Sequence, residues 1–192
     1  MEKYNEIVKH KFIVFCSDHY NPLGVIRSLG EKEIRPIVIL NTNYCKPVLI
    51  VKSKYPQIIH KVGSKEEGLE ILLRVYGNEE YKPFVYSCSD EICELLDTNF
   101  DLLIDKFYFF HGKRKGAVLE YLDKNRINQL AKECGCNVLN NEILKKGQCP
   151  QNLKYPVLTK ALTSTLGRKK CIYVIVRRSY LRHIEALEAK RY

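Results

Sequence analysis

The chain has 192 residues, of which 45% are hydrophobic and 28% charged, a composition typical of a soluble globular protein. Its longest apolar runs, such as residues 12–16, are far too short to cross a membrane or to form the core of a signal peptide, so we expect a cytoplasmic protein without a membrane partner. The net charge of +10 suits an acidic ligand. The sequence contains no ribonucleoprotein motif and no zinc-finger spacing, so it does not favour nucleic acid as that ligand.

The first half of the chain alternates short apolar runs with helical patterns. Apolar runs of this kind predict strands, which we expect at 12–16, 37–40, 48–51, 56–60 and 84–88. Helices are predicted at 23–29, at 65–76 and after Asp90, which we take as an N-cap. This alternation indicates an α/β fold with a parallel sheet, whose strands end along one edge where ligands usually bind.

A polar, basic segment between glycines at 111–116 predicts a domain boundary, with domains at 1–110 and 111–192. Beyond it, Asp123 is a favourable N-cap for a helix that Gly135 ends. Strands are expected at 138–144, in the segment YPVLTKAL and at 171–176, and a last helix begins after Ser179.

Several common sites are not predicted. The eight cysteines form no C-x2-C pair and have no histidine pair nearby, so we expect no metal site and reduced thiols. Cys16 and Cys88 lie in apolar runs, where a cysteine behaves as a small hydrophobic residue. The first loop, CSDHYNPLG, lacks the dinucleotide fingerprint, and no Walker sequence, serine elbow or zinc helix occurs, so no catalytic residue is assigned.

The apolar segment YPVLTKALTSTLG contains one lysine, Lys160, followed by a polar loop. A buried ammonium group is unfavourable unless it meets an anion, although a lysine on an edge strand can also extend to water. The small residues of the loop let backbone N–H groups approach an anion, and the cations after it add positive charge, so the segment favours a polyphosphate. The residues of this candidate site are Lys160, Thr163, Ser164, Thr165, Gly167 and Lys169.

A second lysine, Lys124, lies just inside the predicted N-terminus of the helix after Asp123. A cation at this position opposes the helix dipole, whereas an anion there is stabilised. A residue placed against the local preference indicates a phosphate contact, and the alternative is a solvated lysine that Asp123 offsets.

The C-terminal segment is the most basic part of the chain. Residues 1–164 contain 24 Lys and Arg against 20 Asp and Glu, a net +4, whereas residues 165–192 contain 8 against 2, a net +6. Such a tail can be a solvated or phosphate-facing surface, or it can bind an acidic partner.

Taken together, these segments resemble a known family. The segments LDKNRINQLAKECGCNV and YPVLTKALTSTLG look like the opening of an ATP-grasp domain. The segment FIVFCSDHYNPLGVIRSLGEKEIRPIVIL resembles the Rossmann-like domain that precedes it in carboxylate–amine ligases of the D-aspartate ligase and carbamoyl-phosphate synthetase type. The resemblance covers nearly all of the chain, and it implies a Rossmann-like pre-ATP-grasp domain at 1–110 and an incomplete first ATP-grasp subdomain, of α+β type, at 111–192.

The resemblance also implies a reaction. In this family ATP activates a carboxylate as an acylphosphate, and an amine then displaces the phosphate. Lys124 and Lys160 would contact the phosphates of ATP, the loop at 163–167 would cover them, and Lys169 would add charge. The implied partners are a nucleotide, a small carboxylate and an amine, and Ser17, Asp18 and Asn21 would lie near the acceptor end of the cleft.

The family binds magnesium through a second ATP-grasp subdomain, which the chain does not reach. We therefore expect the magnesium ligands to be absent, and the 192 residues to be inactive alone. We also expect the phosphate-facing sheet to be open and to favour self-association. The alternative function is a non-catalytic module that binds an acidic partner or nucleic acid through the basic tail.

Overall fold

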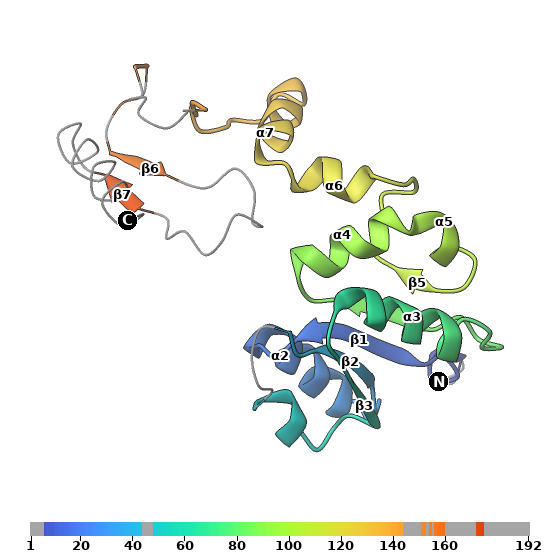
Figure 1. The fold of residues 1–192 in the computed structure, drawn as a ribbon. Coiled ribbons are helices and arrows are strands. Elements are labelled where there is room, and N and C mark those ends of the chain that lie inside the picture. The colour runs from blue at the N-terminus through green and yellow to red at the C-terminus, as the bar shows by residue number, and fades with distance from the viewer. Residues whose placement is uncertain are drawn as a thin grey trace. The chain divides into compact units, whose positions relative to one another are not determined.

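The computed structural model describes residues 6–43, 48–143, 151–152, 154, 156–159 and 172–174, with the backbone alone at 124, 125, 158, 159 and 172–174. The chain divides into two compact units, Met1–Tyr121 and Leu122–Tyr192 (Figure 1). Each unit is described by itself. None of the helices within the described ranges is long and apolar enough to cross a membrane.

The first unit is built on a five-stranded parallel sheet with the strand order β3-β2-β1-β4-β5 (Figure 1). Its strands are β1 (Phe12–Ser17), β2 (Ile37–Asn41), β3 (Ile58–Val62), β4 (Phe84–Ser87) and β5 (Tyr108–Phe109). β1 lies in the middle, paired with β2 on one side and with β4 on the other. The predicted α/β fold with a parallel sheet is confirmed.

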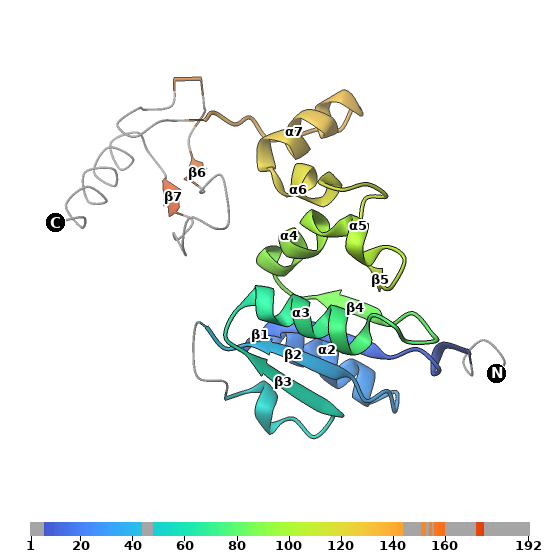
Figure 2. The same ribbon diagram turned by 45° about the vertical axis from the view of Figure 1, so that its right-hand side comes forward.

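Helices cover both faces of this sheet (Figure 2). They are α2 (Tyr20–Gly30), the 3-10 helix η1 (Ile50–Lys52), α3 (Lys65–Tyr76), α4 (Asp90–Thr98) and α5 (Phe100–Leu103), and α6 (Ala117–Leu122) follows them in the chain. On one face α2 and η1 pack in a core formed by Val14, Cys16, Ile26, Val38, Leu40 and Ile50. On the other face α3, α4 and α5 pack in a core that includes Ile13, Phe15, Ile37, Ile39, Leu72, Ile92 and Leu103. Because both faces are buried, the sequences of β1 and β2 are continuous apolar runs.

α3 approaches the sheet closely because it carries a glycine at the contact. A Cβ atom added at Gly68 would collide with the ring of Phe15 and would lie 3.0 Å from Cγ2 of Ile39. A residue without a side chain is therefore required at Gly68 for α3 to lie this close to the sheet.

Some of the predicted elements of the first unit are wrong in detail. The expected strand at 48–51 is not formed, because Ile50–Lys52 is the 3-10 helix η1. The strand predicted at 56–60 is β3, which begins at Ile58 and ends at Val62. Ser89, and not Asp90, is the N-cap of α4, since its hydroxyl accepts the N–H of Ile92 at 3.3 Å.

The second unit contains α7 (Lys124–Glu133) and a hairpin of β6 (Val157–Thr159) and β7 (Ile172–Val174). The predicted helix cap is confirmed, because Oδ1 of Asp123 accepts the N–H of Arg126 at 3.0 Å. Gly135, which follows the helix, has a φ of +75°, as a glycine that ends a helix commonly does.

The strand expected at 138–144 is wrong, because residues 138–143 lie in no strand. In its place the carboxylate of Glu142 accepts the N–H groups of Gln151 and Asn152, at 3.0 and 2.6 Å. These hydrogen bonds tie residue 142 to residues 151 and 152 through its side chain.

The start of α6 packs with the first unit. Ala117 and Val118 are buried, and the N–H of Leu119 donates to Oδ2 of Asp97 in α4 at 3.2 Å. The two compact units divide after Tyr121, whereas the sequence predicted domains at 1–110 and 111–192. That domain assignment stays a prediction.

Candidate functional site

The carboxyl ends of β1 and β4 form a topological switch point. From β1 the chain continues to β2 and β3 on one side, and it then crosses to β4 on the other side of β1. The helix after β1, α2, and the helix after β4, α4, therefore pack on opposite faces of the sheet. In open parallel sheets, ligands bind outside the strand ends at such a point. Ser17 ends β1 and Ser87 ends β4, and both are half-buried.

Asp18, directly after β1, holds the segment that follows β2. Its Oδ2 accepts the N–H groups of Val48 and Leu49 at 2.6 and 2.9 Å, and its Oδ1 accepts that of Ile50 at 2.9 Å. Partial burial raises the pKa of Asp18, but these three hydrogen bonds lower it more, so that it lies below its ordinary value. The carboxylate is ionised at neutral pH and accepts hydrogen bonds from the backbone of residues 48–50. The sequence did not predict this role.

The first turn of α2 also faces this sheet edge. His19 is the N-cap, and its Nδ1 accepts the N–H of Asn21 at 3.4 Å. The side chains of His19, Tyr20 and Asn21 are exposed, and the first turn contains no acidic residue. The sequence missed the capping role of His19, since histidine is not among the residues that favour an N-cap. Ser17, Asp18 and Asn21 thus lie at one strand end, and their contact with a substrate stays a prediction.

Three cysteines lie close to the same strand ends. Cys16 is buried in β1, Cys88 follows β4, and Cys93 in α4 lies with its Sγ 3.0 Å from Oγ of Ser87. Burial, with the neighbouring Cys93, raises the pKa of Cys88 to about 11, and burial raises the pKa of Cys16 as well. Cys16 and Cys88 are therefore neutral at physiological pH and are not nucleophiles. Their prediction as small hydrophobic residues is confirmed.

Within the described ranges, no group of three or more His, Cys, Asp and Glu side chains could hold a metal ion.

The predicted phosphate site lies mainly beyond the described residues. Lys124 is the first residue of α7, and the structure describes its backbone alone. The residues outside the described ranges are Lys160, Thr163, Ser164, Thr165, Gly167 and Lys169. The convergence of the two lysines on one ligand stays a prediction.

The strands on either side of the predicted phosphate loop are paired. β6 and β7 are antiparallel, with Val157 opposite Val174 and Thr159 opposite Ile172. Residues 160–171 therefore join two neighbouring strands. The strand predicted in the segment YPVLTKAL is confirmed over Val157–Thr159, and Lys160, predicted on the same strand, lies outside the described residues.

Comparison with known proteins gives a likeness in structure alone. No family model matches the sequence, and no curated protein matches it either. The crystal structure of an L-amino acid ligase from Bacillus licheniformis superposes with a TM-score of 0.63 at 10% sequence identity, over 93% of this chain and 42% of the ligase. The chain shares the fold of the matched part of this ligase, an ATP-grasp enzyme.

A second solved structure is similar to a smaller degree. It is the biotin carboxylase domain of a thermophilic 2-oxoglutarate carboxylase bound to ADP without magnesium, at 18% identity over 93% of this chain and 42% of that chain. Its TM-score of 0.47 is too low to support a fold assignment. The ATP-grasp fold that the sequence predicted is thus confirmed by the ligase, and the chain spans 42% of the ligase's length.

Charge is distributed very unevenly between the two units of the chain. Residues 1–121 contain 17 Lys and Arg and 17 Asp and Glu, which sum to zero, whereas residues 122–192 contain 15 and 5, which sum to +10. The whole net charge therefore lies in the unit that contains Lys124 and Lys160.

Proposed function

We propose that this chain is the ATP-binding portion of an ATP-grasp ligase that joins a carboxylate to an amine. The observation that carries the proposal is the fold likeness to an L-amino acid ligase, with a TM-score of 0.63 over 93% of the chain. An amino acid carries both a carboxylate and an amine, so small substrates of this class suit the reaction. Because the chain spans 42% of that ligase, the reaction is proposed for a whole enzyme and not for these residues alone.

The proposed chemistry has two steps. A carboxylate oxygen of the first substrate attacks the γ-phosphorus of ATP, and the bond from that phosphorus to the bridging oxygen of ADP breaks. The amine nitrogen of the second substrate then attacks the acyl carbon, and phosphate leaves with the bonding electrons while the nitrogen loses a proton to solvent. In both steps negative charge develops on a phosphate oxygen as the leaving group departs, so positively charged groups and N–H donors around the phosphates lower the barrier.

The residues of the chain would divide this work between the two units. Lys124 and Lys160 would neutralise the phosphates, and the N–H groups of the loop 163–167 would hold the γ-phosphate. The excess of 15 cations over 5 acids in residues 122–192 supports a polyanionic ligand in this unit. Ser17 and Asn21 would orient the acceptor at the sheet edge, while Asp18 holds the segment 48–50 in place.

Reactions of this kind use magnesium to neutralise charge between the phosphates. The donor sets of the described residues do not fit a metal ion, so no step is derived through one. We expect the 192-residue chain on its own to bind ATP without forming ADP.

The test is a calorimetric titration of the chain with ATP, comparing Lys160→Ala with Lys154→Ala. A hydrogen bond between a charged group and phosphate contributes about 1.5–3 kcal/mol, so we expect Lys160→Ala to weaken binding roughly tenfold or more. Lys154 is an exposed lysine a few residues earlier in the same segment, and its variant is the matched control. Absence of ATP binding to the unsubstituted chain, or equal affinity of both variants, would contradict the proposal.

The charge distribution supports a second candidate function, a binding module for an acidic partner or nucleic acid. In that case a single-stranded oligonucleotide would bind with steep salt dependence, and deletion of residues 168–192 would abolish binding while Lys160→Ala would not. Fluorescence anisotropy at two salt concentrations measures both effects. If ATP competes with the oligonucleotide for the unsubstituted chain but not for Lys160→Ala, the ligase proposal is favoured instead.

A further inference from the structure

Two exposed cysteines lie on either side of a glycine at the end of α7. Cys134 directly follows Glu133, the last residue of this helix, and Cys136 comes two residues later. Both thiols are free and both side chains are exposed to solvent. The other free cysteines of the described ranges, which are buried or half-buried, are Cys16, Cys88 and Cys93. Among the described cysteines, small molecules in solution therefore reach this pair most easily.

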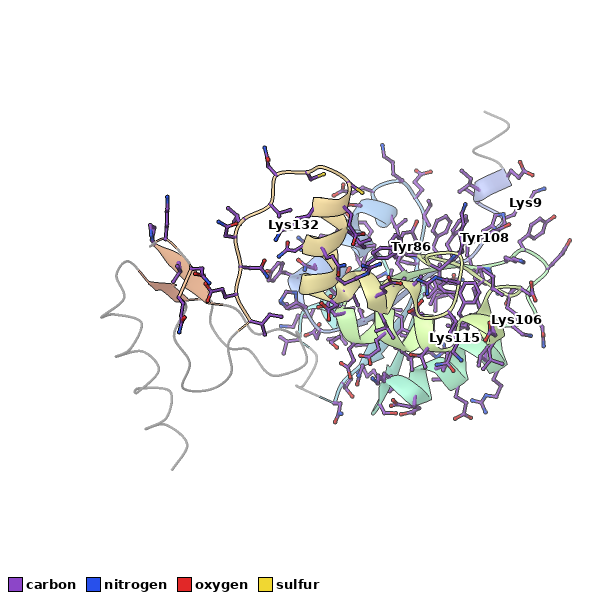
Figure 3. The ribbon with its side chains drawn as sticks, turned by 90° about the horizontal axis from the view of Figure 1, so that it is seen from above. Lys9, Tyr86, Lys106, Tyr108, Lys115 and Lys132 are labelled. Carbon is purple, nitrogen blue, oxygen red and sulfur yellow. The ribbon has the colours of Figure 1, made fainter. Side chains whose placement is uncertain are left out.

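The turn that contains the two cysteines is a Schellman motif. The N–H of Gly135 donates to the carbonyl of Lys132 at 2.9 Å, and the N–H of Cys136 donates to that of Ala131 at 2.8 Å. Figure 3 labels Lys132 in the last turn of α7, just before this motif. Gly135 has a φ of +75°, in the left-handed region. Cys134 is thus the residue that ends the helix, and Cys136 is folded back over the helix end.

This conformation brings the two cysteines within the reach of a disulfide bond. A residue with helical dihedrals, of either hand, separates the Cα atoms of its two neighbours by about 5.4 Å. Disulfides join residues whose Cα atoms are about 4.4–6.8 Å apart. Because glycine has no side chain, the backbone between the cysteines can adjust to the dihedral angles that the bond needs. A methyl group added at Gly135 would meet no described atom within 4 Å, so no described residue packs against the turn and opposes the adjustment.

We propose that Cys134 and Cys136 form a reversible disulfide and are a redox site for small-molecule disulfides such as oxidised glutathione. The thiolate of one cysteine attacks a sulfur of the small disulfide, whose S–S bond breaks and releases one thiolate. The thiolate of the second cysteine then attacks the sulfur of the first, the mixed disulfide breaks, and a second small thiolate leaves. The protein thiols lose two electrons and two protons, and the small disulfide is reduced to two thiols, which take up these protons through solvent.

The size of the ring explains why this bond would be reversible. One residue separates the two cysteines, so the disulfide closes a short loop and restrains the unfolded chain very little. Strain in such a ring and exposure to solvent both make a disulfide easier to reduce, and labile disulfides are those that serve regulation or catalysis. The reduced pair is therefore the form expected where small thiols are in excess. The proposal does not depend on the proposed ligase function, since it uses no residue of the candidate site.

The experiment treats the full chain with oxidised glutathione, blocks the remaining thiols by alkylation and analyses the peptides by mass spectrometry. We expect the peptide that contains both cysteines to lose two hydrogen atoms without keeping glutathione, and reduced glutathione to restore both thiols. In Cys136→Ser the second step is blocked, so glutathione should accumulate on Cys134 roughly tenfold over the unsubstituted chain. Cys93→Ser is the matched control, because Cys93 is half-buried in the first unit, and it should form the disulfide as the unsubstituted chain does.

A second pair of variants tests the role of the glycine. Valine is unfavourable at a positive φ and stiffens the backbone, whereas asparagine tolerates this conformation. We therefore expect Gly135→Val to close the ring roughly tenfold more slowly than Gly135→Asn, with the mixed disulfide accumulating in its place. Circular dichroism monitors the helix, and the result for Cys136→Ser does not depend on these two variants.

Three results would overturn the proposal. The first is a pair that stays reduced, or stops at the mixed disulfide, at every ratio of oxidised to reduced glutathione. The second is a disulfide from either cysteine to Cys149 or Cys171 in place of the bond between the two. The third is a bond between Cys134 and Cys136 that an excess of reduced glutathione does not break, since such a bond would be structural and not a redox site.

Discussion

Asp18 shows how one carboxylate fixes the conformation of a distant segment. Three backbone N–H groups of residues 48–50 point at its two oxygens, at 2.6–2.9 Å. N–H groups used in this way cannot pair with a neighbouring strand, and this is the physical reason why an apolar segment of strand-like composition forms a 3-10 helix. Asp18 therefore links the first strand end of the sheet to the segment after β2.

Replacing Asp18 by asparagine should destabilise the chain in a pH-dependent way. The amide keeps one acceptor but loses the charge, so we expect a loss of about 1–2 kcal/mol at pH 7 in urea unfolding. Because the pKa of Asp18 is lowered in the folded state, its contribution is present above its ordinary pKa of 3.8 and is lost as pH falls through the folded value. The difference between the two proteins should shrink as pH is lowered from about 5 to about 2. A difference that is the same at all pH values would show that the charge is not responsible.

At the scale of elements, the contact of α3 with the sheet predicts opposite effects for two glycine substitutions. Gly68→Ala inserts a methyl group against Phe15 and should cost about 1–3 kcal/mol. A methyl group added at Gly24 in α2 would meet no atom within 4 Å, so Gly24→Ala should stabilise the chain by about 0.5–1 kcal/mol through helix propensity. Thermal unfolding followed by circular dichroism measures both. Equal and favourable effects would mean that α3 shifts to accept the methyl group.

The attachment of α6 to α4 depends on Asp97. This side chain is 1% exposed, and one of its oxygens accepts the N–H of Leu119 while Oδ1 has no hydrogen-bond partner in the described part of the chain. The amide oxygen of the asparagine variant can still accept this N–H, whereas the alanine variant has no acceptor.

We therefore expect Asp97→Ala to speed hydrogen exchange at residues 117–122 more than tenfold, and Asp97→Asn to change it far less. Exchange in α3 is the internal control, since it reports the stability of the whole unit. Equal acceleration in α3 and α6 would indicate global unfolding and not the release of α6.

At the scale of the whole molecule, the sequence predicted those elements whose causes are local or periodic. The strands at the centre of the sheet follow from continuous apolar runs, and α3 follows from its helical spacing over Lys65–Tyr76. The 3-10 helix after β2 could not be predicted, because its hydrogen-bond acceptor is Asp18, some thirty residues earlier. The strand expected at 138–144 was wrong, and the structure offers no comparable hydrogen-bond explanation for it.

The candidate site could be predicted only in part. The position of Ser17 and Asp18 at a strand end follows from the parallel sheet, and the fold likeness confirms the ATP-grasp prediction. The hydrogen bonds of Asp18 and the cap at His19 depend on tertiary geometry, which spacing alone does not contain. The lysines of the predicted phosphate site stay predictions.

The division of charge between the units has a consequence for how the proposed ligands would be attracted in solution. Under the proposed function, the unit with 15 cations and 5 acids would attract a triphosphate from several ångströms away, whereas the other unit, whose charges sum to zero, would exert no net attraction of this range. If the proposal holds, added electrolyte slows binding of the nucleotide and leaves binding of the proposed zwitterionic amino acid unchanged. The two halves would recruit their ligands by different forces, one by attraction at a distance and the other by contact.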